Sequence, residues 1–68
     1  MITYENLWKT MKRKHRSQYY LIHTCGFSAG QLHRLKKNKP VSTHTLEMLC
    51  RYLDCHIDDI VKYVPDNQ

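Results

Sequence analysis

The sequence predicts an all-α fold, a compact bundle of about five short helices. Apolar residues recur three and four positions apart along most of the chain, which is the pattern of helices with one buried face. Serine or threonine stands before four of these stretches, where its hydroxyl can accept a bond from a free backbone N–H of the first turn. Only two glycines and two prolines occur among 68 residues, so linkers are not expected and residues 1–68 should form a single domain.

The first helix is expected to begin near the N-terminus. Thr3 can cap it, and Glu5 lies in its first turn, where the helix dipole favours an acid. Its buried face follows the spacing i, i+3, i+4, i+7. The residues at these positions are Tyr4, Leu7, Trp8 and Met11. A basic run, residues 12–16, follows, and cations there interact favourably with the C-terminal end of the helix dipole.

Residues 17–37 predict two short helices joined by a tight turn. Ser17 can cap the first helix, and Gly26 is expected to end it, because glycine enters the left-handed conformation without steric cost. Ser28 can cap a second helix that runs from Ala29 to about Lys37. The outward residues of this helix are mostly polar or basic: Gln31, His33, Arg34, Lys36 and Lys37. Helix, glycine turn and capped second helix together are the layout of a DNA-binding helix-turn-helix.

The stretch after the motif predicts a loop and a fourth helix. Pro40 removes a backbone donor and forces an extended residue before it, so the preceding helix must end by about Asn38. Ser42 or Thr43 is expected to cap the fourth helix, which runs to about Leu53.

The last stretch predicts a short fifth helix over residues 57–64 that Pro65 ends. His56 is a weak capping residue, although Asp59 at the third helical position can still bind back to the His56 N–H. We therefore expect this helix to fray most easily.

The motif and its flanks resemble the Cro/phage-repressor (XRE-like) helix-turn-helix family, in particular its small stand-alone bacterial members. The segments that carry the resemblance are LWKTMKRK near the start, SQYYLIHTCGFSAGQLHRLKK, and VSTHTLEMLCRYLDCHIDDIVKY near the end. The resemblance implies a lambda-repressor-like DNA-binding domain. It also implies a transcription regulator that acts as a repressor, cytoplasmic and of bacterial or phage-related origin, with no enzymatic activity.

The resemblance further implies which residues contact DNA, because the second helix of the motif lies in the major groove. Matched position by position, the groove-facing residues are Ala29, Gly30, Gln31, His33 and Arg34. Gln18 matches a glutamine that reaches phosphate and sometimes a base. Contacts to the phosphate backbone are implied at two helix starts and just after the second helix, at Ser28, Thr43, Lys37 and Lys39.

Two of these residues depart from the family pattern. Relatives usually carry longer polar or charged side chains at the first two recognition positions, where this chain has Ala29 and Gly30. Alanine can still touch a thymine methyl group, and glycine allows a close approach of the backbone. Direct reading of bases would therefore rest on Gln31, His33 and Arg34, with a further contribution from Gln18 as an option.

The net charge of +5 is unevenly distributed along the chain. Residues 1–46 contain nine lysines and arginines against one acid, whereas residues 47–68 contain two against five acids. A basic front and an acidic back suit a protein that presents one face to a polyanion. Two interpretations of residues 12–16 remain open, a solvated helix end and a contact with DNA phosphate.

Other classes of site find little support in the residue pattern. Three cysteines without secretory context are expected to be reduced and packed as small hydrophobes: Cys25, Cys50 and Cys55. No paired C-x2-C or H-x3-H spacing predicts a zinc site, and no cofactor or small-molecule ligand is indicated. No apolar run is long enough for a transmembrane helix, no secretion signal is present, and so small a domain offers no substrate cleft of the usual size.

The sequence therefore predicts a regulator that reads duplex DNA with residues 29–37 in the major groove. A homodimer on a two-fold operator is an option that the resemblance implies. Val61, Tyr63 and Val64 are candidate dimer contacts, and the closing of the monomer core by the same residues is an equal alternative. The alternative is a protein-interaction module that kept the scaffold and has little DNA specificity, which Ala29 and Gly30 favour. The helices show no excess of bulky apolar residues for a membrane-surface role.

Overall fold

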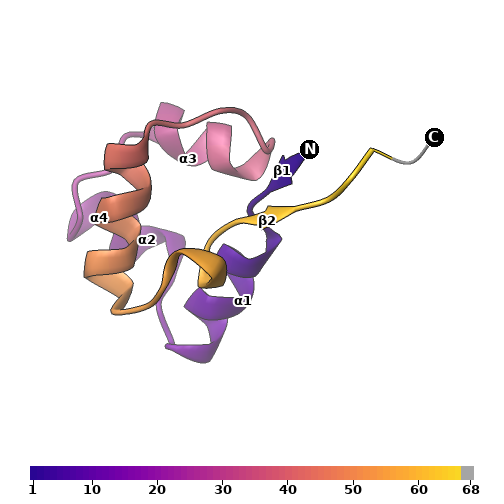
Figure 1. Ribbon diagram of the computed structural model, residues 1–68. Coiled ribbons are helices and arrows are strands. Elements are labelled where there is room, and N and C mark those ends of the chain that lie inside the picture. Colours follow the sequence, from indigo (N-terminus) through magenta and orange to yellow (C-terminus); the bar gives the residue numbers. More distant parts are fainter. Residues whose placement is uncertain (67–68) are drawn as a thin grey trace.

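The computed structural model describes residues 1–66 of the 68-residue chain. Along the chain, a short strand precedes four α-helices and a second short strand follows them, and the two strands pair with each other (Figure 1). The elements in chain order are β1 (Ile2–Thr3), α1 (Glu5–Arg13), α2 (Gln18–His23), α3 (Ala29–Lys36), α4 (Thr43–Leu53), the 3-10 turn η1 (Ile57–Asp59) and β2 (Lys62–Tyr63). The predicted helical fold is confirmed, with four α-helices rather than about five. No helix of residues 1–66 is long and apolar enough to cross a membrane.

One buried cluster joins all four helices. Its members come from the residue before α1, from every helix, from the turn after α2 and from the segment after η1. They are Tyr4, Leu7, Met11, Leu21, Cys25, Phe27, Leu32, Leu35, Leu49, Leu53 and Ile60. Trp8, expected on the buried face of the first helix, and Val41 are partly buried and pack against this cluster. The cluster holds α2 and α3 against α1 and α4, so the polar side of α3 is left at the surface.

Serine side chains cap three of the four helices. Ser17 caps α2 and Ser28 caps α3, as predicted, and of the two candidates for α4 it is Ser42 that provides the cap. The prediction for α1 is wrong, because its N-cap residue is Tyr4 and no side chain forms a cap bond. Thr3 lies instead in β1, where the backbone is paired with β2.

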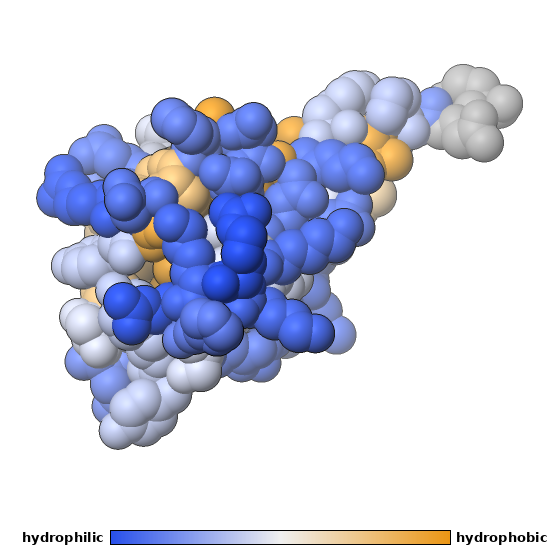
Figure 2. All heavy atoms as spheres, turned by 90° about the horizontal axis from the view of Figure 1, so that it is seen from below, coloured by the Kyte–Doolittle hydropathy of each residue, from blue (hydrophilic) through white to orange (hydrophobic). Residues whose placement is uncertain are grey.

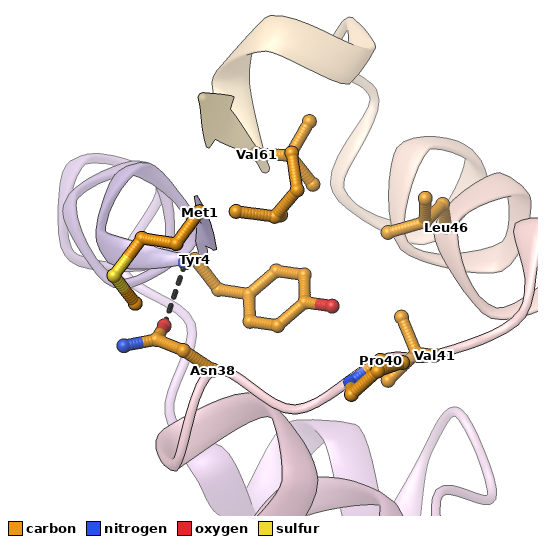
Figure 3. Close-up of a pocket in the computed structure, with 8 residues that line it drawn as sticks. Met1, Tyr4, Asn38, Pro40, Val41, Leu46 and Val61 are labelled. Carbon is orange, nitrogen blue, oxygen red and sulfur yellow. Dashed lines mark hydrogen bonds between the residues drawn. The ribbon is translucent and has the colours of Figure 1, made fainter. Parts of the chain in front are cut away.

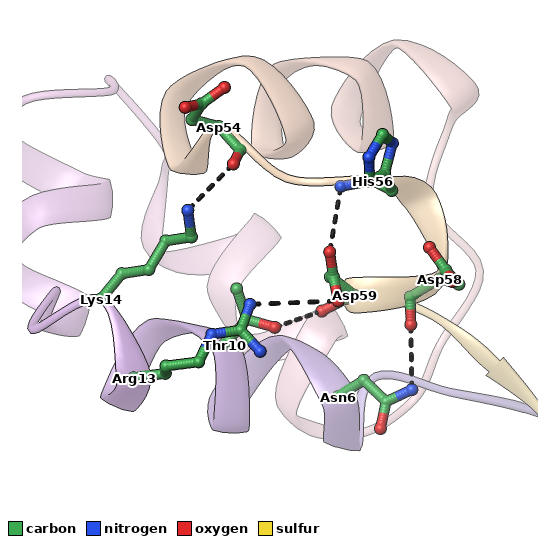
Figure 4. A network of polar contacts seen from close by, with 8 residues as sticks. All are labelled: Asn6, Thr10, Arg13, Lys14, Asp54, His56, Asp58 and Asp59. Atoms are coloured by element: carbon green, nitrogen blue, oxygen red, sulfur yellow. Dashed lines mark hydrogen bonds and ion pairs between the residues drawn. The ribbon is translucent and has the colours of Figure 1, made fainter.

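The predicted fifth helix is also wrong. The chain makes only the turn η1 and then extends into β2, which pairs antiparallel with β1 so that Ile2 lies opposite Tyr63. Side chains of α1 bind the carbonyls that a helix would have used: Thr10 Oγ1 donates to the Asp59 carbonyl at 2.7 Å (Figure 4). The predicted bond from the His56 N–H to the Asp59 carboxylate is present at 3.1 Å, so the cap forms without the helix.

Three helices end on non-glycine residues in the left-handed conformation. They are His15 after α1, Asn38 after α3 and Asp54 after α4, with φ between 51° and 57°. In each case the next residue donates its N–H to a carbonyl five residues back, the bond that closes a Schellman motif. Only Gly26 was expected in this conformation, and its φ of 77° confirms that prediction.

Candidate nucleic-acid interface

The turn between α2 and α3 is built as a helix-turn-helix requires. Ser17 Oγ accepts a hydrogen bond from the Tyr20 N–H at 3.4 Å, which starts α2 and places Gln18 at its exposed first position. After Gly26 the Phe27 N–H donates to the Leu21 carbonyl at 3.0 Å. The Phe27 side chain is buried, so the turn is fixed to the core between the two helices.

A reciprocal pair of hydrogen bonds begins α3. Ser28 Oγ accepts from the Gln31 N–H at 3.1 Å, and the Gln31 Oε1 accepts from the Ser28 N–H at 2.9 Å. This capping box satisfies two backbone donors that would otherwise lack partners. It also occupies one end of the Gln31 amide, so that only the Nε2 end is left to reach a base. Gln31 is half-buried, a departure from the outward position that the sequence indicated.

The remaining predicted groove residues lie on the exposed side of α3. Ala29, Gly30, His33 and Arg34 are exposed, whereas Leu32 and Leu35 face the core at 5% and 0% exposure. A Cβ built on Gly30 would meet only the Ser28 hydroxyl, at 3.8 Å, so the fold of the free protein does not require glycine there. The result is a helix face that is flat near its N-terminus and carries longer side chains one turn later.

The end of α3 and the start of α4 carry the other predicted contacts. Lys37 is the C-cap residue of α3, and Lys39 follows the left-handed Asn38. Both lysines are exposed, as is Thr43 at the first position of α4. The Lys39 N–H donates to the Arg34 carbonyl at 2.9 Å, which turns the chain sharply away from the helix axis.

The basic residues fall into two groups that differ in what they contact. In the run 12–16, Arg13 lies 3.9 Å from Asp59, Lys14 Nζ donates to the Asp54 carbonyl at 2.9 Å, and Arg16 stacks over Tyr20. In contrast, no ion pair forms within residues 1–66 to the cations of α3 and its exit loop: Arg34, Lys36, Lys37 and Lys39. Lys36 was not among the predicted DNA contacts. Its outward position in the helical pattern is the signal that could have identified it.

Most of the run 12–16 therefore has an internal structural role, whereas the cations near α3 are available to an external anion. Hydrophilic residues cover most of the molecular face shown in Figure 2. Hydropathy alone therefore does not mark a binding surface. The unpaired cations of α3 and its exit loop mark it better than the longest basic run, residues 12–16.

The described residues offer no alternative metal centre. Within residues 1–66 no three histidine, cysteine or acidic side chains lie together in a way that could hold a metal ion, and this includes His44, Cys50, Cys55 and His56. Cys25 is buried and the other two cysteines are half-buried, each without a disulfide. Burial raises the pKa of all three thiols, which keeps them neutral at ordinary pH.

A family model for the Cro/C1-type helix-turn-helix DNA-binding domain matches residues 6–66. The chain belongs to this family. Cro/C1-type domains are DNA-binding modules of transcription regulators and not enzymes, and the resemblance inferred from the motif is confirmed. No curated protein matches the chain.

A solved structure, the crystal structure of transcriptional regulator VanUg (form II), is similar to the chain with a TM-score of 0.87 and 31% sequence identity. The alignment covers 96% of this chain and 87% of the VanUg chain. The likeness extends over nearly the whole of both chains.

Proposed function

We propose that this Cro/C1-type domain is a sequence-specific repressor that inserts α3 into the major groove of duplex DNA. The observation that carries the proposal is the set of cations in the second half of α3 and after it that form no ion pair within residues 1–66, on a helix whose start is capped by Ser28. Backbone N–H groups at the starts of α2, α3 and α4 can bind phosphate through donors and dipole together. The lysines supply affinity, and a small number of side chains supply specificity.

Specificity in this proposal rests on Arg34 more than on the other groove residues. Arg34 is exposed on the outer side of α3, and its planar guanidinium can pair with O6 and N7 of a guanine. His33 adds a donor or acceptor, while Gln31 offers only the Nε2 end of its amide. Ala29 and Gly30 allow the backbone to approach the bases closely.

A salt titration on duplex DNA tests the electrostatic part. If four to six cations reach phosphate, log K falls with log salt at a slope of about −4 to −5 per monomer. Fluorescence anisotropy on a labelled random duplex measures this directly. A slope near zero would contradict DNA binding by this surface.

A pair of alanine variants tests the specific part. Arg34→Ala should cost about 1–3 kcal/mol on the preferred site and relax the preference at one base pair. Lys37→Ala, at the end of α3, should weaken binding to all sequences equally and reduce the salt slope by about one. The preferred site comes from selection out of a random duplex pool. Equal losses on specific and random DNA for both variants would make Arg34 another phosphate contact.

The alternative, a protein-interaction module, has one observation in its favour. Ala29 and Gly30 carry no donor or acceptor, and half of the Gln31 amide is engaged in the capping box. A module of this kind should show little binding to random duplex even at low salt, so the same titration separates the two functions.

A homodimer is the proposed active form, because one small helix-turn-helix has limited contact area. Of the three predicted dimer residues, Tyr63 is 65% exposed and Val64 36% exposed, whereas Val61 is half-buried. The pair Tyr63 and Val64 therefore supports the proposal better than Val61 does. Sedimentation of Tyr63→Lys against the unchanged chain tests it, since the variant should dissociate while its helical content stays the same.

A further inference from the structure

The exit loop of α3, residues 37–41, carries two of the lysines proposed to contact phosphate. Its first part is fixed by the helix: Asn38 has a φ of 56°, and the Lys39 N–H donates to the Arg34 carbonyl. After Lys39 the helix provides no further bond, and Pro40 has no N–H to offer. The Asn38 side chain and the Lys39 carbonyl take their partners from outside the helix.

Tyr4, the residue before α1, contacts this loop at successive points. Its N–H donates to Asn38 Oδ1 at 2.9 Å, and its Oη donates to the Lys39 carbonyl at 2.8 Å. Burial raises the pKa of the Tyr4 phenol, and a hydrogen bond with the Val41 backbone partly offsets that rise. Tyr4 thus binds the loop at two successive residues before Pro40, Asn38 and Lys39.

A pocket of about 410 Å³ adjoins these contacts and shows why they matter (Figure 3). The ring of Tyr4 lines it together with Pro40, Val41, Leu46 and Val61. Because of this open space, the apolar side of the loop is only partly packed, with Val41 as its contact to the core, and the hydrogen bonds from Tyr4 help to fix it. Tyr4 itself is only 3% exposed, so its bonds to the loop are shielded from competing water.

We propose that Tyr4 and Asn38 are positioning residues for DNA binding, which hold the exit loop so that Lys37 and Lys39 face the sugar–phosphate backbone. The proposal rests on the proposed function, since it assumes that these lysines contact phosphate. Tyr4 lies 35 positions before Lys39 in the sequence. Its side chain is buried and does not reach the DNA, so its role in DNA binding is exerted through the loop.

The variant Tyr4→Phe removes one oxygen atom and keeps the ring. Tyr20→Phe is the matched control, because Tyr20 Oη also donates to a backbone carbonyl, that of Tyr52 at 3.3 Å, far along the chain from the exit loop. Affinity for a random duplex is measured at several salt concentrations, and melting curves give the folded fraction of each variant. Tyr4→Phe should lose about fivefold in affinity at 0.15 M salt and about 0.9 in salt slope, equivalent to one phosphate contact. Tyr20→Phe should change neither.

A double-mutant cycle with Lys39→Ala separates positioning from a general loss of stability. If Tyr4 acts through Lys39, Lys39→Ala costs less in the Tyr4→Phe background than in the original chain. If Tyr4 only supports the fold, the two losses multiply and the salt slope of Tyr4→Phe stays unchanged. That second result would overturn the proposal.

Asn38→Gly tests the hydrogen bond from the Tyr4 N–H to the Asn38 side chain. It also provides a second test of the proposal if Tyr4→Phe fails to fold. Glycine keeps the left-handed backbone without strain and removes only the acceptor of the Tyr4 N–H. A reduced salt slope with a fully folded chain supports the proposal, and an unchanged slope contradicts it. Should Lys37→Ala and Lys39→Ala leave binding unaffected in the original chain, the proposed function fails instead, so the two failures are distinguishable.

Discussion

The helix-turn-helix, residues 17–37, and the C-terminal segment, residues 54–66, are held by contacts of different range. In the first, each serine cap binds an N–H three residues away, and the turn is closed within six residues. In the second, the partners are far along the chain: the Asp59 carbonyl binds Thr10 and the Asp58 carbonyl binds Asn6 (Figure 4). The caps and the turn of the DNA-reading part are specified locally, although Tyr20 also binds the Tyr52 carbonyl, whereas the C-terminal part depends more on the rest of the fold.

This difference has a physical consequence for substitutions. A locally capped helix start or turn loses mainly its own bond when a residue in it is changed, and distant changes leave the geometry of that cap or turn intact. A segment with long-range partners responds to changes in α1 and in itself alike. We therefore expect the C-terminal segment to be the more sensitive of the two, and three substitutions can test that expectation.

The largest effect is expected from Ile60→Ala. Ile60 is fully buried, and removing its side chain should lower the free energy of unfolding by about 2–5 kcal/mol through lost burial and the cavity left behind. Ile57→Ala, three residues earlier and 48% exposed, is the control and should stay within about 0.5 kcal/mol. Urea unfolding measures both. Similar values for the two variants would mean that the segment is not anchored at Ile60.

Thr10→Val should come next. Valine keeps the shape of the side chain, but the Asp59 carbonyl loses its donor in a site where Thr10 is 2% exposed. The expected cost is about 1–3 kcal/mol, and amides of residues 60–64 should exchange faster while those of α3 keep their protection. The same change at the exposed Thr24 is the comparison. Equal loss of protection in α3 would break the distinction between the two regions.

Ser28→Ala should have a smaller and more local effect. It removes the acceptor of the Gln31 N–H and should cost about 1 kcal/mol of stability. The Gln31 amide proton should exchange faster, and the β1–β2 pairing should be unaffected. Ser17→Ala, whose cap bond is longer at 3.4 Å, should cost less. A loss of protection in β2 would show that the caps are not local.

The smallest effect concerns pH and the thiols. Burial raises the pKa of Cys25 and Cys55, so the folded state favours the neutral form. This contribution to stability is fully present below the ordinary thiol pKa of about 8.5 and is lost as pH rises through the higher folded value. Replacing both cysteines with alanine should remove the part of the stability decline above pH 9 that they cause. An unchanged alkaline decline in urea unfolding would contradict this.

The range of the contacts also explains how much the sequence could predict. Ser17, Gly26, Ser28 and the end of α3 before Pro40 were identified correctly, because each signal acts within a few residues. The fifth helix was predicted wrongly, because residues 57–64 have helical spacing, and nothing local reveals that Thr10 binds the Asp59 carbonyl or that β1 pairs with β2.

The candidate site follows the same rule. Surface positions on α3 such as His33 and Arg34 could be placed from helical periodicity alone. The engagement of the Gln31 side chain could have been inferred, because a glutamine three residues after a capping serine is the pattern of a capping box. The link from Tyr4 to Lys39 could not, since no pattern in one sequence connects residues 35 positions apart.

The pairing of β1 with β2 has a consequence for the order in which the molecule folds. Ile2 and Tyr63 lie at opposite ends of the chain, so closing this loop early would cost roughly 3–4 kcal/mol of chain entropy. Two strands of two residues each return too few bonds to offset that cost before the helices have brought the ends together. The sheet should therefore form last, after the helices have nucleated and packed, and it should be the first structure to open. A probe of folding kinetics placed at Tyr63 would then report the completion of the fold, whereas one at Trp8 would report the collapse of the core.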